Sequence, residues 1–152
     1  MCNECPNGFY TNDRDLDDCF RCDEGQHTPP LPPFIACTLC PKGKWGDVRQ
    51  AVSEQTGCKV CATGRFSDVK GVASVDSVVP CVGCPQGRWS SETGVTKESL
   101  CINCDTGKYT IDEAGQSSEI TCKSCIPGRF SIAIGASGSH TCLNCSIGSV
   151  QN

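Results

Sequence analysis

The sequence predicts a small, disulfide-rich fold that is mostly irregular, with short β-hairpins, arranged as an elongated rod of tandem cysteine-rich repeats. Of the 152 residues, 16 are Cys, 16 are Gly and 9 are Pro, and a Cys content of about 10% is typical of disulfide scaffolds in secreted chains. Leu, Ile, Val and Phe together supply 29 residues, which is too few for the core of one large domain. The third observation is an internal repeat.

The repeat is built on pairs of cysteines. Every cysteine belongs to a C-x-x-C pair, and eight pairs follow one another at steps of 17 to 23 residues. A glycine stands three residues after each pair, at Gly8, Gly25, Gly43, Gly64, Gly87, Gly107, Gly128 and Gly148. A ring stands five residues after seven of the pairs, at Tyr10, His27, Trp45, Phe66, Trp89, Tyr109 and Phe130. We therefore expect one continuous array over residues 1–152, made of eight units of about 20 residues, with no globular domain.

Each unit has the composition of a small hairpin. Glycine directly after a crosslinked residue permits a positive φ or a close approach of two backbone segments. A cation, the ring and a Ser or Thr follow in most units, a short alternating run that is typical of a strand. A second glycine five or six residues after the ring, as at Gly71 and Gly94, indicates the turn back. We assign the glycines and rings to repeat packing, with each ring facing a disulfide or the neighbouring unit.

The cysteines allow three chemical interpretations. Zinc sites use two C-x-x-C pairs about 15 to 20 residues apart, and several gaps here fit that spacing, so a zinc-binding scaffold is a less favoured alternative. A redox C-x-x-C lies between a strand and a helix and occurs as one reactive pair, unlike eight copies on loops. Structural disulfides agree best with a signature that recurs after every pair, and they indicate an extracellular or cell-surface location.

Head-to-tail bonding would close one loop per unit, whereas a bond inside C-x-x-C would make a tight ring. The expected bonds are Cys5–Cys19, Cys22–Cys37, Cys40–Cys58, Cys61–Cys81, Cys84–Cys101, Cys104–Cys122 and Cys125–Cys142. Spacing alone does not prove this connectivity. It would leave Cys2 and Cys145 unpaired within the chain, and we therefore expect the sequence to be a piece of a longer array.

The unit C-x-x-C-x-x-G-x-ring-[Ser/Thr] resembles the ephrin-receptor-like cysteine-rich repeat and the two-cysteine module of tumour-necrosis-factor receptors. Matching residues include Cys84, Gly87, Trp89, Ser90 and Cys101, and the resemblance covers essentially the whole chain. In the receptor module the second Cys of one pair bonds the first Cys of the next, so the resemblance implies the same pairing. The receptors also contain a second module with two crossed disulfides, which is missing from this sequence, so their ligand binding does not carry over.

The expected function is that of a structural or adhesive extracellular segment, acting as a spacer or as a building block of a surface filament or matrix. A ligand-binding segment of a receptor ectodomain is the alternative. We expect neither enzymatic activity nor a cofactor, because no catalytic set or phosphate-binding loop is present. The formal net charge of −4 gives no reason to expect nucleic acid, and no apolar run is long enough to insert into a membrane. The expected partners are proteins, including neighbouring copies of the chain, and glycans.

Three further features are candidates for contact or modification. A proline-rich segment, expected to form polyproline II, could meet a partner or carry O-linked sugar, or could be a stiff loop that spans its disulfide; its residues are Thr28, Pro29, Pro30, Pro32 and Pro33. Asn144 in Asn-Cys-Ser is an N-glycosylation sequon. The cations between glycine and ring could form a basic stripe or stack on neighbouring rings; they are Lys44, Arg65, Arg88, Lys108 and Arg129.

Overall fold

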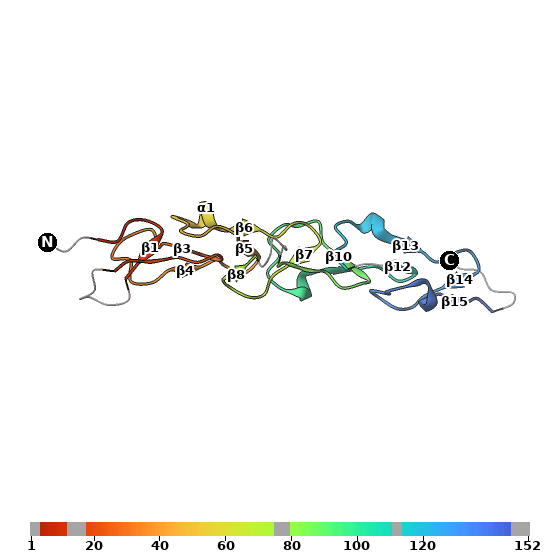
Figure 1. Ribbon diagram of the computed structural model, residues 1–152. Helices are drawn as coiled ribbons and strands as arrows, with labels where there is room; N and C mark the ends of the chain where they lie inside the picture. The colour runs from red at the N-terminus through yellow and green to blue at the C-terminus, as the bar shows by residue number, and fades with distance from the viewer. Residues whose placement is uncertain (1–3, 12–17, 75–79, 111–113, 147–152) are drawn as a thin grey trace. The chain divides into compact units, whose positions relative to one another are not determined.

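The computed structural model describes residues 4–11, 18–74, 80–110 and 114–146. These residues form seven antiparallel hairpins in chain order, one short α-helix and three turns of 3-10 helix (Figure 1). Seven disulfides crosslink them. The prediction of a small, disulfide-rich fold with short hairpins is therefore confirmed. Below, repeats are numbered 1 to 8 by the C-x-x-C pair with which each begins.

Each hairpin pairs the strand that carries a ring with the residues inside the following C-x-x-C. The first three hairpins are β1 (Phe9–Tyr10) with β2 (Phe20–Arg21), β3 (Gln26–His27) with β4 (Thr38–Leu39), and β5 (Lys44–Gly46) with β6 (Lys59–Val60). The next four are β7 (Arg65–Phe66) with β9 (Val82–Gly83), β10 (Arg88–Trp89) with β11 (Ile102–Asn103), β12 (Lys108–Thr110) with β13 (Cys122–Ser124), and β14 (Arg129–Phe130) with β15 (Leu143–Asn144). In this register each ring lies opposite the first of the two residues between the cysteines.

The chain divides into two compact units. The first unit comprises Met1–Cys61 with Ser67–Cys81, and the second comprises Ala62–Phe66 with Val82–Asn152. In the first unit, β8 (Val72–Ala73) adds a third strand, parallel to β5. In the second unit the corresponding contacts are single parallel bridges, which join Phe66 to Val95, Trp89 to Gln116 and Tyr109 to Ala136. In each unit, therefore, the segment after the second glycine of one repeat pairs with the ring strand of the repeat before it.

Short helical turns lead into the first cysteine of four pairs. They are α1 (Glu54–Gly57), η1 (Glu98–Leu100), η2 (Glu119–Thr121) and η3 (Ser139–Thr141). Ser53 caps α1, since its hydroxyl accepts the N–H of Thr56 at 3.3 Å, which is a common way to satisfy the first free amides of a helix. Three of these turns, α1, η1 and η2, begin with a Glu that forms an ion pair with a cation on the ring strand of its own repeat.

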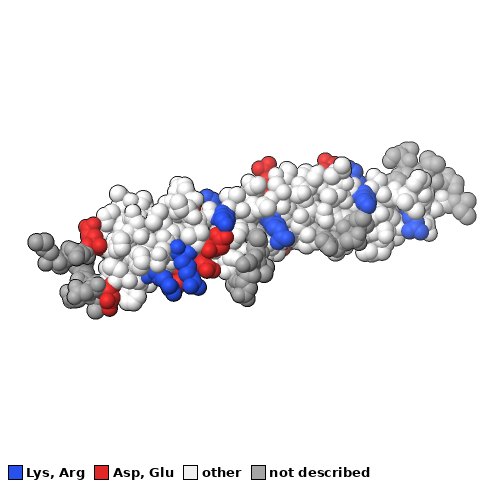
Figure 2. Space-filling view, turned by 45° about the horizontal axis from the view of Figure 1, so that its top comes forward, with Lys and Arg blue, Asp and Glu red and all other residues white. Residues whose placement is uncertain are grey.

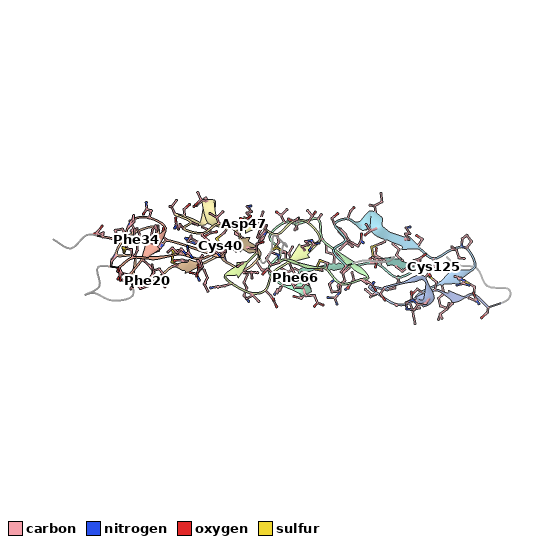
Figure 3. All side chains as sticks on the ribbon, in the orientation of Figure 1. Phe20, Phe34, Cys40, Asp47, Phe66 and Cys125 are labelled. Carbon is pink, nitrogen blue, oxygen red and sulfur yellow. A yellow bond between two sulfur atoms is a disulfide. The ribbon has the colours of Figure 1, made fainter. Side chains whose placement is uncertain are left out.

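Both units have only a small apolar interior. Apart from cysteines, the buried apolar residues in the described part of the chain are Ala51, Phe66, Val95 and Ala136. Most other large side chains drawn in Figure 3 point outward from the ribbon. Phe66 forms a small cluster with Val95 and the bonded cysteines Cys84 and Cys101. Disulfides and backbone hydrogen bonds therefore take the place of a large apolar core, as expected for a chain with this composition.

Candidate functional site

The recurring site of this protein is the junction between successive repeats, and its first component is the disulfide. Seven bonds join the second cysteine of one pair to the first cysteine of the next, with Cα–Cα distances of 5.6 to 5.8 Å, inside the usual range. They are Cys5–Cys19, Cys22–Cys37, Cys40–Cys58, Cys61–Cys81, Cys84–Cys101, Cys104–Cys122 and Cys125–Cys142. A bonded sulfur is no thiolate, so these fourteen cysteines do not form the zinc sites considered as an alternative.

The second component is a tight turn at the glycine after each pair. In repeat 5, Gly87 has a φ of 81°, as required at the third position of a type II turn. The N–H of Arg88 donates to the carbonyl of Pro85 at 3.0 Å and closes this turn. The carbonyl of Gly87 accepts the N–H of Cys104 at 2.8 Å. The same two bonds recur in repeats 1 to 7, so each turn is fixed to the following cysteine pair.

The third component reaches across two repeats. A Cβ atom on Gly87 would overlap the carbonyl oxygen of Gly135, which belongs to repeat 7. The N–H of Gly135 donates to the carbonyl of Cys104 at 2.8 Å. In the first unit, a Cβ atom on Gly25 would lie only 2.6 Å from the carbonyl oxygen of Gly71. Glycine is therefore required here both by its φ and by the close approach of a second backbone.

The residue after each ring is a functional position that the sequence reasoning undervalued. Five of these residues are between 0% and 6% exposed: Thr28, Ser67, Ser90, Thr110 and Ser131. The Oγ atom of Ser90 accepts the N–H of Glu92 at 3.2 Å, and the Ser90 carbonyl accepts the N–H of Gly64 at 2.8 Å. In Thr110 the hydroxyl itself accepts the N–H of Gly87, at 2.6 Å. The recurrence of Ser and Thr was visible in the sequence, but it indicated only a strand.

The rings differ from one another in burial. His27 and Phe66 are each 6% exposed, whereas the other five rings are half-buried. Phe66 packs against a disulfide, as expected for the ring position. Trp45 instead packs across its own hairpin, with the Lys59 Nζ 5.3 Å from the ring centroid, a distance at which a cation is attracted to the ring. The ring centroid of Tyr10 likewise lies 5.9 Å from the ring centroid of Phe20 on the opposite strand.

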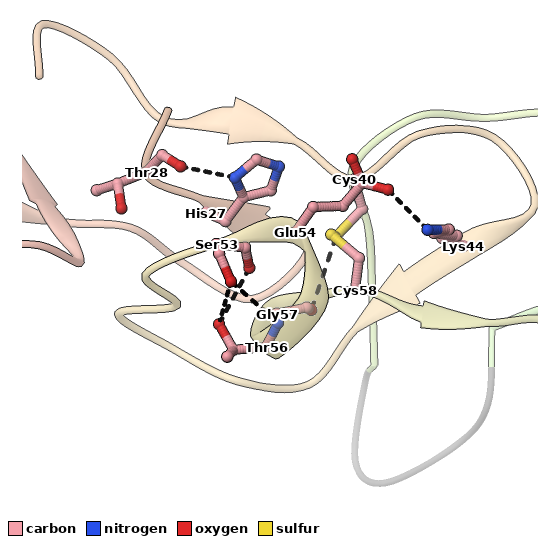
Figure 4. The surroundings of a disulfide bond; sticks show 9 residues. All are labelled: His27, Thr28, Cys40, Lys44, Ser53, Glu54, Thr56, Gly57 and Cys58. Carbon is pink, nitrogen blue, oxygen red and sulfur yellow. Dashed lines mark hydrogen bonds and ion pairs between the residues drawn. A yellow bond between two sulfur atoms is a disulfide. The ribbon is translucent and has the colours of Figure 1, made fainter. Parts of the chain in front are cut away.

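His27 lies in the surroundings of the Cys40–Cys58 disulfide (Figure 4). Its Nδ1 is 2.7 Å from the carbonyl oxygen of Thr28, so Nδ1 carries the proton and donates. The Nε2 atom is buried and has no hydrogen-bond partner. This side chain therefore acts as a packed ring, contributed by repeat 2, beside the disulfide that joins repeats 3 and 4.

Three of the cations between glycine and ring form ion pairs within their own repeat. The pairs are Lys44 Nζ–Glu54 Oε1 at 2.6 Å, Arg88 Nη1–Glu98 Oε1 at 3.1 Å and Lys108 Nζ–Glu119 Oε1 at 2.9 Å. The hydrogen bond from Lys44 lowers the pKa of Glu54, and the hydrogen bond to Glu119 raises the pKa of Lys108. Blue and red atoms adjoin on part of the surface in Figure 2. A basic stripe, one of the two arrangements considered for these cations, is therefore neutralised at these three positions.

The proline-rich loop differs from its expectation in two respects. The backbone bends at residues 30–32, so the segment is not a continuous polyproline II helix. Thr28 is 1% exposed, and its hydroxyl donates to the carbonyl of Val52 at 3.1 Å. Thr28 is thus a packing residue and is not available for O-linked sugar. Pro30, Pro32 and Pro33 are exposed, while Pro29 is half-buried.

The remaining candidate residues lie near the chain ends. Asn144 is exposed in β15, opposite Arg129, so its side chain is accessible. Cys145 has a free, half-buried thiol, and its N–H donates to the carbonyl of Gly128 at 2.9 Å, as in the other second cysteines. Cys2 and Gly148 lie outside the described residues.

Comparisons with known proteins do not assign this chain to a family. No protein-family model matches the chain, and no curated protein matches it. Within residues 4–11, 18–74, 80–110 and 114–146, no helix has the length and apolarity needed to cross a membrane, and no three His, Cys, Asp or Glu side chains gather where they could hold a metal ion. The seven consecutive disulfides and the short hairpins therefore support a cysteine-rich repeat protein on their own.

Proposed function

We propose that this chain is a structural segment of the extracellular environment, which acts as a spacer or as a building block of a surface filament or matrix. The observation that carries the proposal is the unbroken series of seven head-to-tail disulfides. Bonds of this kind form and persist in oxidising compartments outside the cytosol. The same chemistry supports an extracellular or cell-surface location.

Head-to-tail bonding makes each repeat resistant to stretching. Cys104 and Cys122 are 18 residues apart in sequence, but their Cα atoms are only 5.6 Å apart. A pull along the chain passes through the sulfur atoms, so the loop between them carries no load while the bond is intact. An extended chain spans about 3.4 Å per residue, so this loop holds back about 55 Å of length.

The buried side chains also support a structural role. Ligand pockets are usually lined by hydrophobic and aromatic side chains. The largest fully buried side chains among the described residues are instead Thr and Cys, with Thr28 and Thr110 foremost. No observation on the described part of the chain specifically favours the alternative of a ligand-binding ectodomain.

Force spectroscopy on the oxidised 152-residue chain, held at its two ends, tests the proposal. We expect no release of loops under load until a reductant is added, and then steps of about 40 to 60 Å, one for each disulfide. Replacing both Cys104 and Cys122 by Ser should free a single step of about 55 Å in the absence of reductant.

Two results would contradict the proposal. One is extension of the oxidised wild-type chain by such steps without reductant. The other is a chain that leaves the secretory pathway of a host cell with free thiols at the fourteen bonded positions, as measured by non-reducing peptide mapping.

A further inference from the structure

The one Asn-x-Ser/Thr triplet in the sequence lies at the last described hairpin. Asn144 is followed by Cys145 and Ser146, the spacing of an acceptor for N-linked sugar. Asn144 lies in β15, in register with Arg129 of β14. Asn144 and Ser146 are both exposed, so the amide that would carry the sugar and the hydroxyl that defines the triplet are accessible in the folded chain.

The place of Asn144 in its hairpin faces solvent in repeat after repeat. It is the second of the two residues between the cysteines of a pair. In repeats 2 to 8 this position is occupied by Arg21, Leu39, Val60, Gly83, Asn103, Ser124 and Asn144, and all of these except the half-buried Gly83 are exposed. A cation, aliphatic side chains, a hydroxyl and amides all occur here, so the hairpin does not depend on the side chain at this position. A bulky group attached here therefore stays outside the interior.

Asn103 shows how an asparagine at this position packs when another repeat follows. It pairs in register with Arg88, which has the same place in repeat 5 as Arg129 has in repeat 7. A Cβ atom on Gly135, in the repeat after that of Asn103, would lie 2.8 Å from the Asn103 Oδ1. Asn103 is nevertheless exposed. The position thus combines contact with the following repeat and access to solvent, and N-linked sugar is attached to the amide nitrogen, not to this oxygen.

Charged residues are scarce in the sequence around the triplet. Residues 125–146 contain a single Lys, Arg, Asp or Glu, which is Arg129, whereas the preceding stretch of equal length, residues 103–124, contains six. The six are Asp105, Lys108, Asp112, Glu113, Glu119 and Lys123. N-linked sugars are bulky and make protein surfaces more soluble. An oligosaccharide on Asn144 would therefore add hydrophilic surface to a stretch that has little charge of its own.

We propose that Asn144 carries an N-linked oligosaccharide, which projects from β15 into solvent. This inference rests on the proposed function, because the sugar is attached in the secretory pathway. The donor is an oligosaccharide linked to a lipid diphosphate. A bond forms between the Asn144 Nδ2 and the anomeric carbon of the sugar, and the bond from that carbon to the diphosphate breaks. The lipid diphosphate leaves, and the amide nitrogen loses one proton.

Peptide mapping of the chain secreted by a eukaryotic host cell tests the inference. Free thiols are alkylated, and an amidase that removes N-linked sugars then converts each asparagine that carried one to aspartate, in water enriched in heavy oxygen. We expect Asn144 to be converted and labelled in most secreted molecules. Asn144→Gln and Ser146→Ala should each abolish the label, whereas Ser146→Thr should keep it.

Asp105→Ser is the matched test of the position within the hairpin. It gives Asn103 a hydroxyl residue two positions later, so we expect a second sugar on Asn103 in this variant. Native-state hydrogen exchange tests whether the sugar on Asn144 stays clear of the hairpin. The amide of Cys145, which donates to the carbonyl of Gly128, should exchange at the same rate in the glycosylated wild type and in Asn144→Gln.

Three results would contradict the inference. A secreted chain with its seven internal disulfides and a bare Asn144 would overturn it, and the proposed function would remain supported. No sugar on Asn103 in Asp105→Ser, or faster exchange at Cys145 in the glycosylated chain, would overturn the claim that this position accepts sugar without disturbing the hairpin. Free thiols at the fourteen bonded positions would instead contradict the proposed function itself.

Discussion

Replacing Gly87 by Ala tests whether backbone packing between a repeat and the repeat after next stabilises the second unit. Gly87 and Gly128 have almost the same φ, 81° and 82°. A Cβ atom on Gly87 would overlap the carbonyl oxygen of Gly135 and lie 3.1 Å from the carbonyl carbon of Ala136, whereas a Cβ atom on Gly128 would have no neighbour within 4 Å. Gly128→Ala is therefore a control that changes the backbone preference without the steric contact.

The magnitudes of the two effects differ enough to separate them. An L-residue in the left-handed region costs about 1 to 2 kcal/mol, and this penalty applies to both variants. Overpacking against a fixed backbone costs about 1 to 3 kcal/mol more, and only Gly87→Ala incurs it. We therefore expect Gly128→Ala to lower the free energy of local opening by about 1 to 2 kcal/mol and Gly87→Ala by about 2 to 5 kcal/mol.

Native-state hydrogen exchange on the oxidised protein measures this local free energy without assuming that the chain unfolds as one unit. The informative amides are those of Cys104, which donates to Gly87, and Gly135, which donates to Cys104. For Gly128→Ala the corresponding amide is that of Cys145. An extra loss of about 2 kcal/mol corresponds to about 30-fold faster exchange. Equal acceleration in the two variants would refute the claim that the contact with repeat 7 requires glycine.

Three further predictions follow from the junction. Thr110→Val should lower the free energy of unfolding by about 1 to 3 kcal/mol, because the buried N–H of Gly87 loses its acceptor. Thr110→Ser keeps the hydroxyl and should cost less. Equal losses of the two variants, measured by thermal unfolding, would contradict the role of the hydroxyl. Lys44→Gln should raise the pKa of Glu54 towards its ordinary value of 4.5, as followed by NMR of the carboxyl carbon, and Lys42→Gln should leave it unchanged. Because the folded pKa of Glu54 is lowered, the contribution of this pair to stability is present above about pH 4.5 and is lost as the pH falls through the folded pKa. The pKa of Lys108 is raised above 10.5, so its contribution is present below that value and is lost as the pH rises through the folded pKa; Glu119→Gln should bring the pKa of Lys108 back down in an NMR titration.

The features that could be predicted from the sequence are those that depend on residues close together in the chain. The positive φ angles of Gly71 and Gly94, 69° and 67°, follow from a glycine at a fixed distance from a ring. The hairpins follow from a short alternating run between crosslinked positions. Each of these depends on interactions within about one repeat, so composition and spacing contain the necessary information.

Features that depend on contacts between repeats were not predictable in the same way. Repeat 3 has no glycine five or six residues after its ring, Trp45. Gln50 takes this position with a φ of 57° and donates its N–H to the carbonyl of Cys22 at 2.8 Å. The signal used for the turn back was glycine, and it does not identify a glutamine held in the same conformation by its neighbours. Thr28 is buried and donates its hydroxyl to the Val52 carbonyl of the next repeat, so this residue is not available for the O-linked sugar that was one possibility for its loop.

By itself, the sequence determined the periodicity, the hairpin built at each glycine and the need for crosslinks in place of a large core. These follow from local backbone preferences and from the number of apolar residues. The tertiary structure alone decided which side chain of each repeat is buried, which cations are neutralised and which repeat departs from the pattern. The physical reason is that burial and ion pairing depend on where the neighbouring repeats place their backbone, and the order of residues within one repeat does not specify that placement.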